Sequence, residues 1–148
     1  MVRLLNVMLA LCLLCAFLIG CTDNSEAANG VDVDLRTLST TMAEAEFRNI
    51  TANSDDYVGK TISASGELFS VFIDSFDRYF RYIGITEGDD LCCPPEGFEI
   101  RLSGDHVVDD DYPAAGTIIE VTGVLSRAEE FDIRFLYLAV DDIIILSD

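Results

Sequence analysis

The chain has 148 residues, half of them hydrophobic, and its 27 acidic and 9 basic side chains give a formal net charge of −18. This length is typical of one domain. The charge argues against nucleic acid as a partner, because a protein that binds phosphates needs a basic surface to displace their counterions.

The first 20 residues have the layout of a secretory signal peptide. One positive charge at Arg3 precedes an apolar run, Leu4–Ile19, in which Asn6 is the one polar break. A run of this kind at the N-terminus is too short for a comfortable membrane span and is typical of a cleaved export signal. We therefore expect residues 1–20 to be removed and the rest of the chain to be exported.

The apolar run ends in Leu18-Ile19-Gly20-Cys21, which resembles the lipobox of bacterial lipoproteins. In that family the cysteine thiol receives diacylglycerol and a dedicated peptidase cuts immediately before it, so the resemblance implies that Cys21 becomes the lipidated N-terminus. A small Gly20 gives the peptidase access to the backbone, and two acyl chains anchor more firmly than one. We expect a protein that is lipid-anchored to a bacterial membrane on its extracytoplasmic side, at the cell surface or in the periplasm.

A polar segment and a helix follow the signal. Residues 21–37 are mostly small, polar and acidic, which predicts a flexible acidic tether. From Leu38 apolar residues recur at spacings of three and four, which predicts a short amphipathic helix that ends near Asn53. Thr40 or Thr41 is expected to cap this helix. A turn containing Asp55 and Asp56 is expected to follow it.

Strand-like segments make up the remainder of the chain. They cover 60–73, 79–86, 98–102, 117–125 and 135–146, the last with a possible break at Asp141-Asp142. The first is long and contains Gly66, which predicts a bend or bulge. These features predict a mainly β fold for residues 38–148, a small five-stranded OB-like barrel preceded by one short helix. A six-stranded sandwich is the competing architecture.

Three segments carry a second resemblance: Asp56–Gly66, the pair Cys92-Cys93 before a Pro-Glu-Gly stretch, and Thr117–Gly123. They are similar to segments of a family of bacterial membrane-linked proteins with OB-like domains, whose best-known relatives are encoded beside a predicted permease. The similarity covers residues 50–147. In the family an Ala-Asp-Ala stretch commonly follows the double cysteine, whereas Pro94 follows it here. The family has no settled activity, so the resemblance implies a fold more than a function.

Cys92-Cys93 is the most unusual chemical feature of the domain, since two of the five cysteines lie in the signal peptide and a third is Cys21. The pair is compatible with a strained and easily reduced vicinal disulfide. It is also compatible with a metal site, in which His106 and carboxylates supply further ligands. Two small side chains at a strand entrance, partly buried and without a chemical role, are the third interpretation.

Aromatic residues gather in one part of the predicted sheet, at Phe69, Phe72, Phe76, Tyr79, Phe80 and Tyr82. Alternation is expected to place half of them in the core and half outward. Packing in the core and within the hairpin is the favoured interpretation, and an outward surface that stacks on a sugar, a peptide or a protein segment is the alternative. The acidic clusters, of which Asp109-Asp110-Asp111 is the longest, lack the spacing of a calcium loop and are interpreted as solvated. With a single histidine and nothing to orient it, the sequence shows no nucleophilic triad.

Two functional hypotheses follow. The first is a non-enzymatic, lipid-anchored binding module of the cell envelope that needs no cofactor and contacts an envelope protein or a small molecule. The second is a metal-handling or thiol-redox accessory protein that uses Cys92 and Cys93, binds a metal ion and is linked to a transporter. The residues that contact a ligand are not identified by the sequence.

Overall fold

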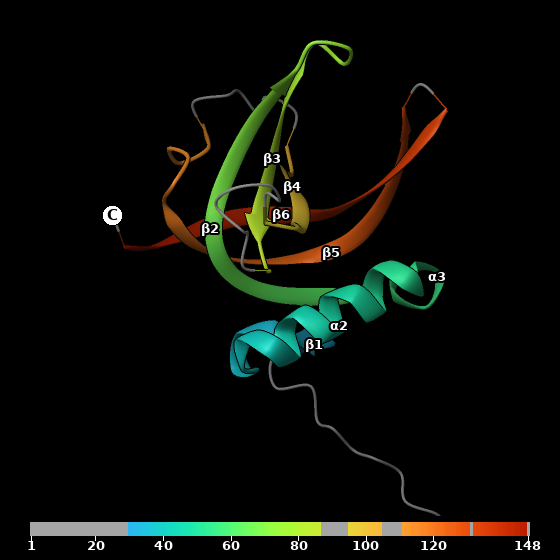
Figure 1. The fold of residues 1–148 in the computed structure, drawn as a ribbon, viewed down its shortest axis with the longest axis vertical. Coiled ribbons are helices and arrows are strands. Elements are labelled where there is room, and N and C mark those ends of the chain that lie inside the picture. Colours follow the sequence, from blue (N-terminus) through green and yellow to red (C-terminus); the bar gives the residue numbers. More distant parts are fainter. Residues whose placement is uncertain (1–29, 87–94, 105–110, 131, 148) are drawn as a thin grey trace, which may run out of the picture.

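The computed structural model describes residues 30–86, 95–104, 111–130 and 132–147 (Figure 1). These residues form a mainly β fold, as predicted. The strands are β1 (Val33–Asp34), β2 (Thr61–Ile73), β3 (Arg78–Gly84), β4 (Gly97–Leu102), β5 (Ile118–Glu130) and β6 (Ile133–Ser147). The helices are the short 3-10 helix η3 (Leu35–Thr37), α2 (Thr40–Ala52) and α3 (Ser54–Tyr57). No helix in these ranges is long and apolar enough to cross a membrane.

The strand pairings form a closed circuit. They run from β2 to β3, β4, β6 and β5, and β5 pairs with β2 again. All of these pairs are antiparallel except β4 with β6. The short β1 lies parallel to β2, outside the circuit. A single sheet whose last strand pairs with its first is the arrangement expected of an OB-like barrel. A sandwich would have two separate sheets facing each other, whereas the described residues form one sheet.

The bend predicted at Gly66 is present, and it allows one strand to serve two neighbours. Residues Thr61–Glu67 of β2 pair with β5, whereas Leu68–Ile73 pair with β3. A Cβ atom at position 66 would lie 2.1 Å from the carbonyl oxygen of Gly84. Only glycine fits this close backbone approach, and Figure 1 shows β2 curving strongly along its length.

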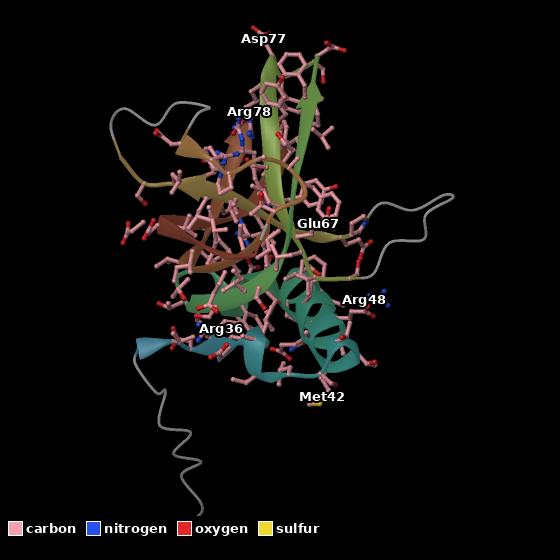
Figure 2. All side chains as sticks on the ribbon, turned by 90° about the vertical axis from the view of Figure 1, so that its left-hand side faces the viewer. Arg36, Met42, Arg48, Glu67, Asp77 and Arg78 are labelled. Atoms are coloured by element: carbon pink, nitrogen blue, oxygen red, sulfur yellow. The ribbon has the colours of Figure 1, made fainter. Side chains whose placement is uncertain are left out.

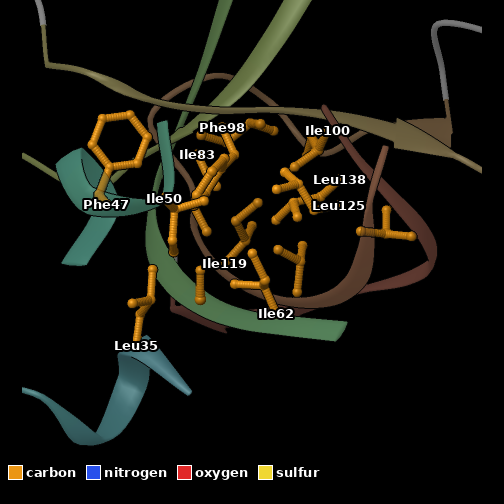
Figure 3. Packing of buried hydrophobic residues seen from close by; sticks show 14 residues of the cluster. Leu35, Phe47, Ile50, Ile62, Ile83, Phe98, Ile100, Ile119, Leu125 and Leu138 are labelled. Carbon is orange, nitrogen blue, oxygen red and sulfur yellow. The ribbon is translucent and has the colours of Figure 1, made fainter. Parts of the chain in front are cut away.

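The core lies inside the circuit and is built by alternating positions of the strands. Its fully buried strand members include Ile62, Ala64, Leu68, Ile83, Ile100, Ile119, Leu125 and Leu138. The helix α2 adds Phe47 and Ile50 to this cluster (Figure 3). The Phe47 ring meets the Phe98 ring edge to face, with 4.9 Å between centroids. Hydrophobic periodicity therefore predicted the strands and the helix. Of the apolar positions on the helix, Phe47 and Ile50 are buried, whereas Met42 is 59% exposed.

The folded part begins earlier than the predicted end of the tether at residue 37. Val33 and Asp34 pair with β2, and Leu35 is only 4% exposed. The side chain of Arg36 forms ion pairs with Asp34 and with Glu120 of β5. One buried leucine among polar residues was too weak a pattern to predict this docking, yet it ties the N-terminal segment to the barrel.

Three local predictions around α2 and β6 need correction. The N-cap of α2 is Ser39, which makes no side-chain capping bond, so neither Thr40 nor Thr41 caps the helix. The two acidic residues expected in a turn lie in α3 instead. The strand β6 continues through Asp141-Asp142, where the register with β5 shifts without ending the strand.

Candidate ligand-binding face

The residues singled out for lipidation and metal binding lie outside the described residues. These are Cys21, Cys92, Cys93 and His106. The structure therefore gives no distance between these side chains, and the metal and disulfide hypotheses stay predictions. Within the described ranges, no group of three histidine, cysteine or acidic side chains is placed to hold a metal ion.

The aromatic residues of the β2–β3 hairpin pair with one another. Phe69 stacks on Tyr82 at 5.2 Å, Phe72 meets Tyr79 at 5.1 Å, and Phe76 meets Phe80 at 5.3 Å between ring centroids. None of the six belongs to the buried core. The expectation that half of them would face the core was wrong, because alternation assigns a side of the strand but does not tell how far a hairpin extends past the core.

Two hairpins project from the barrel and contact each other. The turn of the first lies between β2 and β3, and the turn of the second lies between β5 and β6 (Figure 1). The ring of Phe135 on β6 lies 5.5 Å from that of Phe76 and 5.7 Å from that of Phe80. Arg78 at the start of β3 forms an ion pair with Glu130 at the end of β5. Both an apolar and an ionic contact thus join the hairpins.

Four charged side chains from three strands form a continuous network beside this junction. Both Arg78, through Nη1, and Arg101, through Nε, donate to Oε1 of Glu99 at 2.8 Å. Arg78 also donates to the two carboxylate oxygens of Glu130 at 3.2 and 3.3 Å. Arg101 Nη2 donates to Oε1 of Glu130 at 2.9 Å. Each carboxylate therefore binds both guanidinium groups, and the network as a whole has no net charge.

Burial and pairing set the ionisation of this network. The Glu99 side chain is only 9% exposed, and those of the two arginines are each 28% exposed. Burial alone would raise the pKa of Glu130, but the hydrogen bonds and charges of Arg101 and Arg78 outweigh it and hold that pKa below its ordinary value. The two carboxylates thus neutralise two arginines on the surface of a strongly acidic protein.

Aromatic rings support both guanidinium groups. Arg78 lies 3.6 Å from the ring centroid of Phe80, and Arg101 lies 4.4 Å from that of Tyr137. Such stacking fixes the plane of a guanidinium and adds a cation–π attraction. Figure 2 labels Arg78 just below the hairpin tip at Asp77.

The two arginines, Glu99 and the aromatic rings beside them lie on the outer side of β3, β4 and β6. Ile83, Ile100 and Leu138 point into the core, so their neighbours in the chain point outward. We define the β3–β4 face as the outward side chains Arg78, Phe80, Tyr82, Glu99, Arg101 and Tyr137.

The β3–β4 face keeps hydrogen-bonding capacity for a ligand. Within the part of the chain that the structure describes, Arg101 Nη1 and Glu99 Oε2 have no hydrogen-bond partner. Neither atom is a buried and unsatisfied group. The face therefore presents donors and an acceptor beside aromatic rings, which suits a polar ligand without net charge.

Sequence reasoning did not select the four charged residues of this network. One feature that points to them is the alternation of Phe98, Glu99, Ile100 and Arg101, which places two opposite charges on the outer side of a short strand. Glu130 could not be found in this way, because its contact with β3 and β4 depends on how far β5 extends. Comparisons of the chain with protein-family models, with curated proteins and with solved structures give no match.

Proposed function

We propose that this protein is a non-enzymatic, lipid-anchored binding module of the bacterial envelope, which holds its partner on the β3–β4 face. The observation that carries the proposal is the neutral network of two arginines and two glutamates, stacked on aromatic rings beside two joined hairpins. In OB-type barrels the corresponding strands and hairpin loops are the usual place for ligands. This likeness in architecture supports the location of the site and does not identify the ligand.

The ionisation of the charged network favours binding over catalysis. A general acid or base works best with a pKa near the working pH. Here the arginines hold the pKa of Glu130 below its ordinary value, away from neutrality. The network is suited to hydrogen bonding and to holding a fixed shape. We infer a polar partner, either a segment of an envelope protein or a small molecule such as a sugar, and no nucleic acid because the chain has a net charge of −18.

Loss of outward rings tests the location of the binding face. In the full chain the double substitution Tyr82→Ala and Tyr137→Ala removes two rings of the β3–β4 face, and we expect it to abolish chemical crosslinking to the partner in intact envelopes. Val124→Ala is the control, since Val124 is 41% exposed and lies on β5, which does not pair with β3. Equal crosslinking by both variants, or no crosslinked partner of the unchanged protein, would contradict the proposal.

The anchor is tested separately. The lipobox residues Leu18-Ile19-Gly20-Cys21 support lipidation at Cys21. We expect Cys21→Ala to give an unprocessed precursor that incorporates no labelled fatty acid. Normal cleavage and lipid incorporation in this variant would show that the anchor is wrong, whatever the outcome for the β3–β4 face.

A further inference from the structure

Among the residues that the structure describes, the last part of β6 has a strand partner on one side only, and we call its other side the open edge. On one side β6 pairs with β4, but this pairing ends at Leu102 and Val140. On the other side it pairs with β5 as far as Ser147. Among the residues that the structure describes, no strand pairs with the first side beyond Val140. The edge of residues 141–147 therefore offers its backbone groups to another strand.

A bulge separates this edge from the barrel. Val121 of β5 lies opposite Ile143, whereas Gly123 lies opposite Val140, so Thr122 faces two residues of β6. Bulges of this kind bend a strand and increase its twist, which accounts for the end of pairing with β4. The backbone N–H of Ile143 donates to the Oδ1 atom of Asp142 at 2.8 Å. This strand N–H is thus bound by a side-chain carboxylate and not by a backbone carbonyl.

The open edge is strongly apolar. Ile144, Ile145 and Leu146 are 53%, 54% and 50% exposed. Natural proteins protect exposed edges with charges, especially lysine, with proline, with short strands or with bulges. Residues 141–147 contain neither lysine nor proline, and their bulge and two charges precede the apolar residues that begin at Ile143. The only charges in this segment are those of Asp141 and Asp142, both exposed. Exposed apolar groups beside unpaired backbone are typical of a surface that binds another chain.

We propose that this edge binds an extended segment of a partner protein in which apolar and basic residues alternate, and that the segment adds a strand beside β6. Its backbone would hydrogen-bond to the edge, and its apolar residues would cover Ile144 and Leu146. A carbonyl of the segment replaces the Asp142 carboxylate at the N–H of Ile143. The released carboxylate, together with that of Asp141, then pairs with lysine or arginine of the partner.

Charge favours such a partner over a second copy of this chain. Two copies would each bring a net charge of −18 to the contact, and like charges oppose association. In antiparallel pairing of two β6 edges, the aspartates of each copy would lie opposite apolar residues of the other, and residues 141–147 contain no basic side chain to pair with them. A basic segment is attracted by the negative charges of Asp141 and Asp142 and of the chain as a whole. This edge lies on β6 beyond the β4 pairing, so the proposal does not depend on the β3–β4 face.

Peptide binding to the full chain tests the proposal. The probe is a fluorescent hexapeptide of alternating lysine and valine, and the readout is its anisotropy. One control replaces lysine by glutamate, and the other carries N-methyl groups on alternate amides, which removes strand hydrogen bonds without changing charge. We expect the controls to bind about tenfold more weakly and the binding of the probe to weaken as salt is added. Equal binding of all three peptides, or no binding of any, would overturn the proposal.

A matched pair of variants locates the contact. Ile144→Lys adds a positive charge to the edge and is expected to weaken probe binding about tenfold. Met42→Lys makes the same change in charge on α2, at a side chain that is 59% exposed, and is expected to leave binding unchanged. Circular dichroism of both variants checks that they fold. If both bind like the unchanged protein, or if sedimentation shows a dimer that Ile144→Lys dissociates, the proposed occupant is wrong.

Discussion

Glu99 is the residue through which the charged network is most directly tested. Its carboxylate is 9% exposed and accepts hydrogen bonds from Arg78 and Arg101, each at 2.8 Å. The substitution Glu99→Ala leaves two neighbouring guanidinium groups without one of their two carboxylates. Loss of one partner from a fully buried ion pair costs about 3–5 kcal/mol. Because the arginine side chains are 28% exposed, water compensates in part, and we expect a loss of about 2 kcal/mol.

Urea unfolding of the full chain, followed by circular dichroism at neutral pH, measures this loss. The control is Glu129→Ala, since Glu129 is 63% exposed and lies 3.8 Å from Arg134; we expect it to cost less than about 0.5 kcal/mol. Glu99→Gln keeps one acceptor oxygen but not the charge, and its stability is expected between those of Glu99→Ala and the unchanged protein. If Glu99→Ala and Glu129→Ala unfold with the same free energy, the network does not stabilise the face and our reasoning is refuted.

Three further predictions concern the barrel and its dependence on pH. Gly66→Ala places a methyl group 2.1 Å from the carbonyl oxygen of Gly84, so it is expected to cost about 3 kcal/mol or more in the free energy of unfolding; an unchanged midpoint in urea would contradict the close approach. Phe47→Ala removes a 6% exposed ring that contacts Phe98 and is expected to cost about 3 kcal/mol; a calorimetric melting temperature equal to that of the unchanged protein would show that α2 does not close the core. The pKa of Glu130 is lower in the folded protein than its ordinary value of about 4.5. The ionised carboxylate therefore stabilises the fold fully above about pH 4.5, and this stabilisation is lost as the pH falls through the pKa of the folded state. Melting temperatures measured from about pH 6 down to pH 2 should accordingly fall less steeply for Glu130→Gln than for the unchanged protein.

Local sequence patterns predicted the helix and the strands of this mainly β fold, because such patterns depend on near neighbours in the chain. Alternation in β2 and in the first part of β5 predicted two faces for each strand, and the structure buries the faces that hold Ile62 and Val121. Glycine at position 66 predicted the bend in β2. Apolar residues at spacings of three and four predicted the helix, which buries Phe47 and Ile50 but leaves Met42 59% exposed. These features each follow from the geometry of one helix or one strand.

The candidate site depends on contacts between distant segments, and it could not be predicted in the same way. Arg78 lies 52 positions before Glu130 in the chain and 21 before Glu99. Their meeting requires the strand order and the length of two hairpins, neither of which a local pattern contains. The same limit applies to Leu35, whose burial depends on the parallel pairing of the N-terminal segment with β2.

Site-specific photo-crosslinking in intact cells tests the binding face most directly. A photoreactive phenylalanine replaces Tyr82 on the β3–β4 face in one strain and replaces Val124 on β5 in another. We predict one discrete crosslinked species from position 82 that is absent when the label is at position 124. An identical pattern from both positions, or no crosslinked species from position 82, would contradict the assignment of this face.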